Sequence, residues 1–443
     1  MAGGSMGIAP KIIVLDDDPT GSQTVHSCLL LLQWDVETLV EGLQDDAPIM
    51  FVLTNTRALS PEQAEAVTRT VCQNLKVAIP QAGIEDFLVV SRSDSTLRGH
   101  YPIETDAIAA ELGPFDAHFM VPAFFEGGRI TRDSTHYVVQ EGISIPAHET
   151  EFAQDSVFGY STAYLPDYVA EKTQGNIKAN QVERFTSDRL RAGTLEALLT
   201  LQNNVCVAVD GEVQADLDTF AQDVLAAAAQ GQRFLFRSAA SLLTALAALP
   251  PQPIAAADMA QYVKDHHPGA ILVGSHVQKT TQQLTQLLKQ PDVVGVEVDV
   301  TQMIDNWSIG KTRLLEATLT RIKQIHDRGQ TPAIYTSREE LTFPDVQTRL
   351  AFGEQISALL MDIVRGLPRD LGFLISKGGI TSNDTLSRGL ALQTTRLLGQ
   401  ILPGVSVVRT EADHPQFAAM PVVLFPGNVG DENALALAYQ RLS

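Results

Sequence analysis

Three carboxylates in succession, Asp16, Asp17 and Asp18, follow the apolar run 11–15 near the start of the chain. Carboxylates placed directly after a buried strand cost free energy unless they hold a cation or accept hydrogen bonds from hydroxyl groups. Asp17 and Asp18 are therefore candidates for contacts with a substrate. Asp17 is also a candidate acceptor for a substrate proton.

Two further apolar runs end in polar residues of a complementary kind. Arg57 follows the run 49–54, and a segment rich in hydroxyl groups and charges follows the run 87–91. Guanidinium groups bind carboxylates through paired hydrogen bonds, while carboxylates and hydroxyl groups bind sugar hydroxyls. The mixture suits a polyhydroxylated acid as the ligand. The candidates in the second segment are Ser93, Asp94, Ser95, Thr96 and Arg98.

Each of these loops has a simpler interpretation when it is taken alone, because a helix cap with surface ion pairs uses the same residue types. Three such loops at one edge of a parallel sheet favour a binding site, since ligands bind outside the carboxyl ends of the strands. His26, His100 and His136 could contact a ligand, although a structural hydrogen bond is the simpler role for each. Arg129 and Arg132 are weaker additions to the set.

The loops in the second half of the chain are rich in glycine and nearly uncharged. Two apolar runs, 371–376 and 421–425, are each followed by glycines and then by a segment with helical spacing. A strand, small residues and a helix N-terminus present free backbone amides and the positive end of the helix dipole to phosphate. Neither a Walker sequence nor GxGxxG occurs, which excludes the classical P-loop and dinucleotide patterns. The candidates for nucleotide contacts are Ser275, Gly378, Gly379, Ile380, Thr381 and Gly427.

Short apolar runs alternate with helix-period segments along the chain, which is typical of α/β proteins with parallel sheets. The prolines of 250–253 suggest a connector. We therefore predict two domains, 1–250 and 251–443, each a mostly parallel sheet with helices on both faces, and an active site in the cleft between them. Strands are expected at 11–15, 49–54, 87–91, 118–122, 205–209, 233–236, 270–274, 294–298, 332–336, 371–376 and 421–425, and helices at 216–229, 345–366, 383–398 and from Asp431. The segment 130–185 has too little periodicity for a prediction.

The composition is that of a globular protein with an acidic surface. The 443 residues include 52 Asp and Glu against 32 Lys and Arg, a formal net charge of −20. This charge disfavours nucleic acid and anionic membranes as partners, because both would be repelled, although solubility is its simplest explanation. Three cysteines without a CxxC pattern predict neither disulfides nor structural zinc. With no apolar run long enough to span a membrane, we expect a cytoplasmic protein.

Five motifs, in order along most of the chain, carry a resemblance to a known family. The sequence is similar to the four-carbon acid sugar kinases at LDDDPTGS (15–22), TNTRA (54–58), SRSDSTLRGH (91–100), SKGGITSND (376–384) and FPGNVGDENAL (425–435). The resemblance implies a kinase that phosphorylates threonate, erythronate or their oxo derivatives with ATP. It also implies that the N-terminal domain binds the sugar acid and that the C-terminal domain binds the nucleotide.

Transferred position by position, the resemblance implies roles for individual residues. Substrate contacts would come from Asp17, Asp18, Arg57 and the turn 93–96. ATP contacts would come from Ser275, from 378–381 and from Gly427, with Mg²⁺ neutralising the phosphates. The sequence departs from the commoner family pattern at Pro19, Ser22 and Ile380. Because these positions line both sites, the identity of the sugar acid stays open.

For a kinase, Asp17 and Asp94 are both candidates to accept the proton of the attacking hydroxyl, and Arg57 and Arg98 are candidates to hold the substrate carboxylate. The sequence does not rank the two aspartates. The alternatives are a non-catalytic sensor of nucleotide or sugar acid, and a kinase of the same family acting on a different sugar acid. A dehydrogenase is disfavoured because GxGxxG is absent. A homodimer is the default expectation for the oligomeric state.

Overall fold

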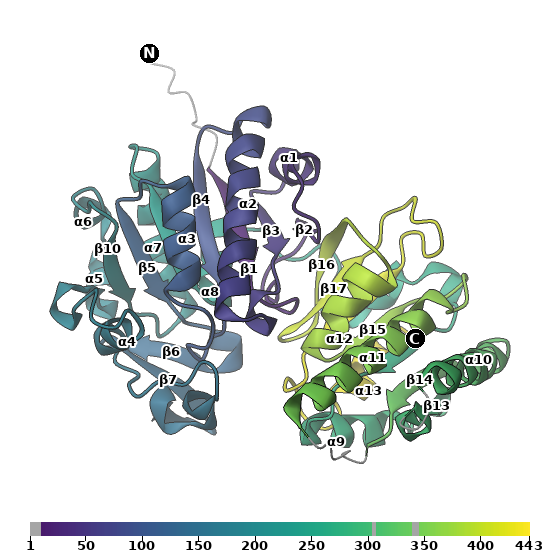
Figure 1. Ribbon diagram of the computed structural model, residues 1–443. Coiled ribbons are helices and arrows are strands. Elements are labelled where there is room, and N and C mark those ends of the chain that lie inside the picture. The colour runs from purple at the N-terminus through teal and green to yellow at the C-terminus, as the bar shows by residue number, and fades with distance from the viewer. Residues whose placement is uncertain (1–9, 304–306, 339–344) are drawn as a thin grey trace. The chain divides into compact units, whose positions relative to one another are not determined.

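The computed structural model describes residues 10–303, 307–338 and 345–443. The chain divides into two compact units, Met1–Pro250 and Pro251–Ser443 (Figure 1). Each unit contains a mostly parallel sheet together with helices, which confirms the predicted α/β fold class. No helix in the described ranges is both long enough and apolar enough to cross a membrane.

A parallel sheet forms the centre of the N-terminal unit. Its strands are β1 (Lys11–Asp16), β2 (Leu29–Leu31), β3 (Ile49–Leu53), β4 (Phe87–Arg92), β5 (Ala117–Val121), β9 (Glu183–Phe185), β10 (Val205–Val209) and β11 (Phe234–Ser238). They lie in the order β2-β3-β1-β4-β11-β5-β10-β9. The run Ile12, Ile13, Val14 is buried on both faces of β1, as expected of a central parallel strand. The six strands predicted in this half are all present.

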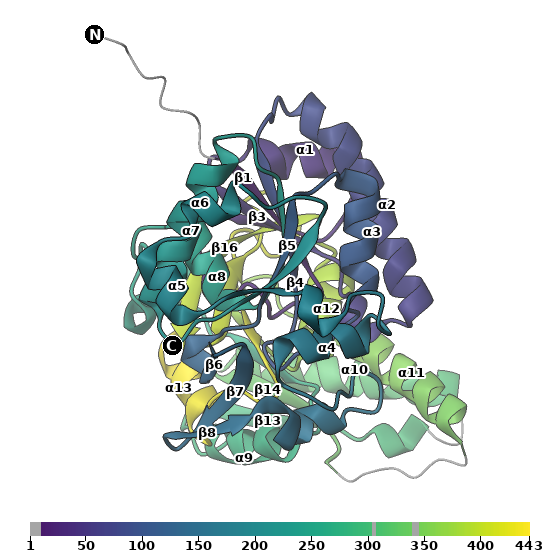
Figure 2. The same ribbon diagram turned by 90° about the vertical axis from the view of Figure 1, so that its left-hand side faces the viewer.

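Helices cover both faces of this sheet (Figure 2). One group comprises α1 (Val36–Gln44), α2 (Pro61–Gln81) and α3 (Ile103–Leu112), and the other comprises α5 (Ser187–Ala192), α6 (Leu195–Leu198), α7 (Gln214–Ala228) and α8 (Ala240–Ala247). Ser60 and Gln63 form a reciprocal capping box that starts α2. Val71, Leu75 and Ala78 recur at helical spacing and pack α2 onto the sheet.

The segment that the sequence left without a prediction is an insertion with its own small core. It contains the antiparallel strands β6 (Arg129–Arg132), β7 (Thr135–Gln140) and β8 (Ile143–Pro146), followed by α4 (Leu165–Lys172). Val138, Tyr160 and Tyr168 of this insertion share a buried cluster with Leu97. The insertion therefore packs directly against the loop after β4.

The C-terminal unit combines parallel and antiparallel strands. They are β12 (Ala270–Val273), β13 (Val293–Val298), β14 (Thr331–Thr336), β15 (Leu374–Lys377), β16 (Thr394–Leu402), β17 (Val405–Arg409) and β18 (Pro421–Phe425). The order is β13-β14-β12-β15-β18-β17-β16, with the first five strands parallel and the last two pairings antiparallel. The helices are α9 (Gln278–Leu287), α10 (Trp307–His326), α11 (Val346–Arg365), α12 (Gly379–Asp384) and α13 (Ala434–Gln440).

The helix predicted over 383–398 is present only as far as Gly389, and the prediction is wrong for the rest of the segment. Helix α12 ends at Asp384 and a single π-helical turn continues to Gly389, after which the chain enters strand β16. The apolar residues of this run fit a helical period, but the β-branched pair Thr394 and Thr395 favours a strand. Hydrogen bonding to β17 therefore makes the residues of β16 a strand and not the continuation of a helix.

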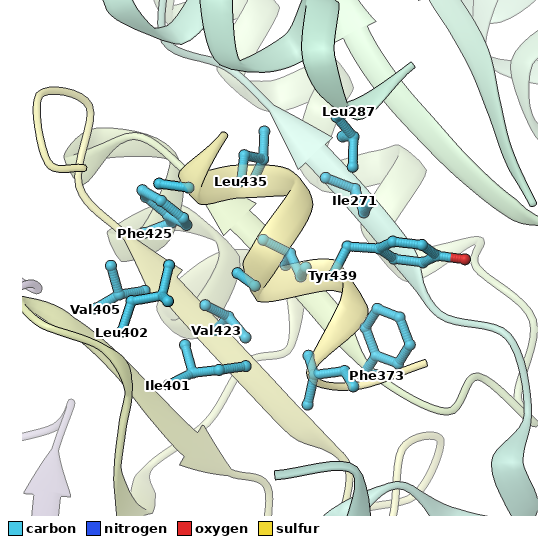
Figure 3. Packing of buried hydrophobic residues seen from close by; sticks show 14 of the residues in the cluster. Ile271, Leu287, Phe373, Ile401, Leu402, Val405, Val423, Phe425, Leu435 and Tyr439 are labelled. Atoms are coloured by element: carbon cyan, nitrogen blue, oxygen red, sulfur yellow. The ribbon is translucent and has the colours of Figure 1, made fainter. Parts of the chain in front are cut away.

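Figure 3 shows α13 lying across the core of the C-terminal unit, with Leu435 and Tyr439 among Ile271, Phe373 and Val423. The ring centres of Phe373 and Tyr439 lie 6.2 Å apart. Burial of such side chains stabilises a domain by about 1.5–3 kcal/mol each. This packing fixes α13 and thereby the loop between β18 and α13.

Candidate active site

The loops after β1, β3 and β4 meet through ion pairs centred on Arg57. Its Nη2 and Nε lie 2.5 and 3.2 Å from the two carboxylate oxygens of Asp17. Its Nη1 lies 3.2 Å from Asp18 Oδ2 and 3.8 Å from Asp94 Oδ1. The predicted residues Asp17, Asp18, Arg57 and Asp94 therefore form one cluster at the carboxyl edge of the sheet.

The turn after β4 is organised around Asp94. Arg98 Nε donates to Asp94 Oδ2 over 2.9 Å, and the hydroxyl and amide of Thr96 donate to the same oxygen. Burial alone would raise the pKa of Asp94, but the guanidiniums of Arg57 and Arg98 outweigh it and hold the pKa far below its usual range. Asp94 is therefore ionised at any physiological pH. Ser93 Oγ links this turn to the first loop by donating to an oxygen of Asp17 over 2.8 Å.

The exposed fractions of these side chains decide which of them can touch a ligand. Asp17 is 1% exposed, whereas Asp94, Arg57, Asp18 and Arg98 are 14%, 19%, 21% and 25% exposed. The adjoining pocket, about 20 Å³ in volume, holds roughly one water molecule. A ligand therefore reaches the cluster from its partly exposed side.

The insertion holds the backbone of the 93–99 turn. His136 Nε2 lies 2.7 Å from the carbonyl oxygen of Ser95, while the hydroxyls of Tyr160 and Tyr168 donate to the carbonyls of Thr96 and Leu97 over 2.8 and 2.7 Å. Burial lowers the pKa of His136 to about 4, so its imidazole is neutral.

The other two candidate histidines also make hydrogen bonds to backbone carbonyls. His100 Nε2 lies 3.1 Å from the oxygen of Leu59, and His26 Nε2 lies 2.7 Å from the oxygen of Pro250. All three histidines thus make the structural hydrogen bonds that were the simpler expectation.

Arg237 at the end of β11 is a residue of this site that the sequence did not reveal. Its Nη1 lies 2.6 Å from Glu104 Oε2, and its Nη2 donates to Ser93 Oγ over 2.8 Å. Glu104 also accepts a hydrogen bond of 2.5 Å from Thr56 Oγ1. The available signal was a charged residue that directly follows three apolar residues in the strand FLFRS. Gly99 has φ +128°, and a Cβ there would lie 2.3 Å from Ser93 Oγ and 2.6 Å from Arg237 Nη2, so the backbone conformation and the close approach together require glycine.

Asp16, the first of the three carboxylates, lies beneath the loop rather than in it. Burial raises its pKa to about 8, although Arg92 opposes the shift, with Nη1 at 3.6 Å from Asp16 Oδ1. Asp16 Oδ2 is buried without a hydrogen-bond partner. A Cβ at Gly21 would overlap this carboxyl group, which explains the glycine of the TG pair. Asp16 is therefore a neutral support for the turn at pH 7.

In the C-terminal unit, the loops after β12, β15 and β18 converge on Ser275. A Cβ built on Gly378 would lie 3.1 Å from Ser275 Cβ, and one built on Gly427 would lie 3.1 Å from Ser275 Oγ. A Cβ on Gly274 would overlap Thr381 Oγ1. The predicted residues Ser275, Gly378, Thr381 and Gly427 therefore lie together, on three neighbouring strands.

The backbone at the start of α12 is arranged to donate hydrogen bonds. Gly378 is the N-cap with φ +122°, so the amides of Gly379, Ile380 and Thr381 have no acceptor within the helix. Ile380 is 70% exposed. These amides, with the helix dipole behind them, form a surface suited to an anion.

Lys377, immediately before the glycines, is buried between two loops. Its Nζ donates to the carbonyl oxygens of Pro426 and Gly427 and lies 4.2 Å from the ring centre of Phe425. Burial, together with the charge of Lys279, lowers the pKa of Lys377 to about 7. The side chain thus fixes the loop after β18 and titrates near neutrality.

A larger pocket, about 610 Å³ in volume, lies beyond the ends of β13 and β14. Arg338 connects it to the glycine loops, because its Nη1 and Nη2 donate to Ser275 O and Thr281 Oγ1 over 2.7 and 2.6 Å. The lining residues are Thr281, Leu284, Thr285, Leu288, Glu297, Asp299, Thr301, Tyr335, Ser337 and Arg338. The pocket thus combines an apolar wall with carboxylates and a guanidinium.

The sheet topology also favours ligand binding at this edge. Crossover from β12 to β13 and crossover from β14 to β15 run in opposite directions along the sheet, so right-handed connections put α9 and α11 on opposite faces. Helix α12, which follows β15, contacts α11. The helices that follow the neighbouring strands β12 and β15 therefore lie on opposite faces of the sheet, and this arrangement leaves a crevice between the carboxyl ends of the two strands.

Two family models match nearly the whole chain. One, a sugar-binding N-terminal domain, matches residues 12–246, and the other, a nucleotide-binding C-terminal domain, matches residues 270–435. A D-erythronate kinase of Heliobacterium modesticaldum is 23% identical over 96% of this chain and 95% of its own. A D-threonate kinase of Bordetella bronchiseptica is 28% identical over 35% of this chain and 38% of its own.

The fold also has a counterpart among solved structures. A Salmonella typhimurium LT2 protein described as a candidate tRNA synthase superposes with a TM-score of 0.69, covering 97% of this chain and 98% of its own. Its sequence is 19% identical, so this similarity concerns the fold alone.

Proposed function

The chain belongs to the four-carbon acid sugar kinase family and is a phosphotransferase, and on this premise we propose that it transfers the γ-phosphate of ATP to a hydroxyl of a four-carbon sugar acid such as erythronate or threonate. The observation that carries the proposal is a correspondence between the matched domains and their loops. The sugar-binding match contains the carboxylate and guanidinium cluster, and the nucleotide-binding match contains the convergent glycine loops.

The sugar acid would bind on the partly exposed side of the Arg57 cluster. Asp18 and Arg57 would bind its hydroxyl groups, since each presents a polar edge to solvent. In the turn after β4, Ser95 and Arg98 would contact the remaining hydroxyls. Ser93 and Thr96, which the sequence also proposed as substrate contacts, are buried and hydrogen-bonded to Asp17 and Asp94, so they would position these two aspartates. The hydrogen bonds from the insertion support this assignment, because they hold the turn before any ligand arrives.

Of the two candidate catalytic aspartates, Asp94 is the better placed to contact the attacking hydroxyl. Its Oδ2 is occupied by Arg98 and Thr96, but its Oδ1 has only a 3.8 Å contact with Arg57. Asp17 has both oxygens engaged and is 1% exposed, so it would position Arg57 rather than meet the substrate. A strongly ionised Asp94 suits phosphoryl transfer, in which orientation of the nucleophile matters more than a high proton affinity.

ATP would lie along the carboxyl edge of the second sheet. Its phosphates would bind the amides of 378–381, Ser275 and Gly427, and its nucleoside would lie in the 610 Å³ pocket. Strand β14, which borders the pocket, lies three strand spacings from β18 in the sheet. At the usual spacing between neighbouring strands, β14 and β18 are roughly 14 Å apart. This span is comparable with an extended nucleotide.

Mg²⁺ would bind chiefly through the ATP phosphates. No group of three His, Cys, Asp or Glu side chains suited to a metal occurs among the described residues. Asp17 and Asp18 are already paired with Arg57. The metal would neutralise the charge of the phosphates.

The sequence also predicted that the sugar-acid and ATP sites meet in a cleft between the two domains, and this stays a prediction.

The test is ADP release with ATP, Mg²⁺ and a panel of C4 to C6 aldonic and oxo-acids, measured by a coupled assay. We expect turnover with at least one four-carbon acid and none with the tetritol that lacks the carboxylate. Protein that binds ATP and an acid yet releases no ADP with any of them would contradict the proposal.

A further inference from the structure

Arg129, the first residue of β6, is an arginine without an anionic partner in the described part of the chain. Its Nη1 donates to the carbonyl oxygen of Gly127, and its Nε is buried without an acceptor. No carboxylate among the described residues lies within ion-pair distance of it. Burial lowers the pKa of Arg129, although a guanidinium stays charged in proteins. A desolvated charge of this kind is unfavourable until an anion pairs with it.

The position of Arg129 is at the sugar-acid site. Its guanidinium carbon lies 5.8 Å from the ring centre of Phe152, and the guanidinium carbon of Arg98 lies 5.1 Å from the same centre. The charge of Asp94 acts on the pKa of Arg129 as well. One phenyl ring thus holds two guanidiniums near the aspartate proposed to contact the attacking hydroxyl.

The other arginines of the cluster already have carboxylate partners. Arg57 pairs with Asp17 and Asp18, and Arg98 pairs with Asp94 and, at 3.7 Å, with Asp155. Recruiting either to a substrate carboxylate would require breaking an existing pair. Arg92 lies 3.9 Å from Asp17 and Arg237 lies 2.6 Å from Glu104, and both arginines are buried.

We propose that Arg129 binds the carboxylate of the sugar acid and thereby selects an acid over the neutral polyol. This inference rests on the proposed kinase function and replaces the sequence-based expectation that Arg57 and Arg98 hold that carboxylate. Arg57 and Arg98 then serve the hydroxyl groups and the geometry of Asp17 and Asp94. Phe152 supports Arg129 from one side, which leaves the planar fork of the guanidinium pre-oriented for a bidentate contact.

The test replaces Arg129 by Ala and by Lys and measures steady-state kinetics together with direct binding of the acid. For Arg129→Ala we expect KM and Kd for the acid to rise roughly 30-fold, as for loss of a charged hydrogen-bonded contact. KM for ATP should change less than about twofold. Arg129→Lys should recover part of the loss, because it keeps the charge without the fork. Millimolar guanidinium should partly rescue Arg129→Ala.

The matched control is Arg69→Ala on α2. Arg69 is 40% exposed and pairs with Glu65 and Glu111, so its replacement should leave all constants near wild type. A neutral tetritol serves as the second ligand, and Arg129→Ala should bind it as wild type does. Equal losses for acid and tetritol, or an unchanged Kd for the acid, would overturn the role of Arg129.

The outcomes separate this inference from the kinase proposal. Wild-type turnover combined with unchanged acid affinity in Arg129→Ala overturns only the inference. Wild-type binding of the acid without ADP release, together with weakened binding in Arg129→Ala, overturns only the kinase proposal. A wild-type protein that binds no acid overturns both.

Discussion

The loops at the carboxyl edge of each sheet position their residues in opposite ways. We call the edge with Arg57, Asp17, Asp18 and Asp94 the charged edge, and the edge with Ser275, Gly378 and Gly427 the glycine edge. At the N-terminal edge, charged side chains lock one another, as in the pairing of Arg57 with Asp17 and Asp18. At the C-terminal edge, precision comes from missing side chains, since Gly378 and Gly427 bring three loops against Ser275. Removal of a charge should therefore impair function at the first edge, and addition of a methyl group should impair it at the second.

The largest effect is expected from Asp94→Asn at the charged edge. The variant loses the ionised oxygen that would orient the attacking hydroxyl, and Arg98 loses its closest carboxylate. We expect kcat to fall by about 10³-fold or more, with Kd for ATP unchanged. Steady-state kinetics and nucleotide titration would measure the two quantities.

The control for Asp94→Asn is Asp218→Asn, which removes an exposed carboxylate on α7. Its kcat should equal that of wild type. Asp17→Asn should also lower kcat severely, because Arg57 would lose its bidentate partner. Near-normal kcat in both Asp94→Asn and Asp17→Asn would show that the charged edge is not the catalytic one.

The second prediction adds one methyl group at the glycine edge. Gly378 has φ +122°, and its new Cβ would lie 3.1 Å from Ser275 Cβ. Gly378→Ala should cost about 1–3 kcal/mol of strain at the N-cap of α12 and weaken ATP binding about tenfold or more. Affinity for the sugar acid should not change. Isothermal titration with each ligand would measure both.

Gly353→Ala is the matched control. Gly353 lies in α11 and is exposed, and no atom lies within 4 Å of the position that a Cβ would take there. Alanine there should stabilise the protein by about 0.5–1 kcal/mol and leave ATP binding intact. Equal ATP affinity in both alanine variants would refute the role of close approach at Gly378.

The sequence reveals these two edges because the residues at each strand end are local in the chain. All eleven predicted strands are present, although β15 begins at Leu374 rather than 371. What local pattern could not supply is the partner of a residue. Arg237 and Glu104 are 133 positions apart, and only the fold brings them within 2.6 Å.

The same limit applies to Arg129, whose significance depends on having no carboxylate within ion-pair distance among the residues that the structure describes. The secondary structure of the insertion that holds the turn after β4 could not be predicted either, because its short antiparallel strands lack a sustained hydrophobic period. The segment 383–398 shows a different failure. Its apolar spacing fits either structure, but the helix ends at Gly389 and the chain from Thr394 on forms a strand that pairs with β17.

A third prediction concerns Asp16, the buried acid beneath the charged edge. Its pKa of about 8 in the folded protein lies above the ordinary 3.8, so the native state holds a proton that the unfolded state has released. Its contribution to stability is complete below pH 4 and is lost as the pH rises toward 8, by about 1.4 kcal/mol per pH unit. Asp16→Asn, which is always neutral, should remove this slope.

Urea unfolding of wild type and Asp16→Asn at pH 5, 6, 7 and 8 would measure the difference in the free energy of unfolding. We expect the variant to gain on wild type steadily as the pH rises. A difference that does not vary with pH would mean that Asp16 is ionised in the native state and that Arg92 is its full ion-pair partner.

The fourth prediction concerns Lys377 at the glycine edge, whose effect on stability should depend on pH in the opposite direction. The pKa of Lys377, about 7 in the folded protein, lies below the ordinary 10.5, so between these values the unfolded state binds the extra proton. The contribution of Lys377 is therefore present above pH 10.5 and is lost as the pH falls through 7. Lys377→Met should remove this dependence, so the variant should gain on wild type from pH 9 to pH 7. A constant difference over that range would contradict the shifted pKa.

The smallest effect is expected from Ile380, although it lies in the first turn of α12, directly after Gly378 and Gly379. Its side chain is 70% exposed, so if ATP binds the backbone amides, the side chain contributes little. Ile380→Ser should change KM for ATP by less than about threefold. Ile380→Glu should also stay near that range, because the favourable interaction of a carboxylate with the helix N-terminus, about 0.3–1 kcal/mol, opposes its repulsion of phosphate. A loss of a hundredfold in either variant would mean that this edge, like the other, binds its ligand through side chains.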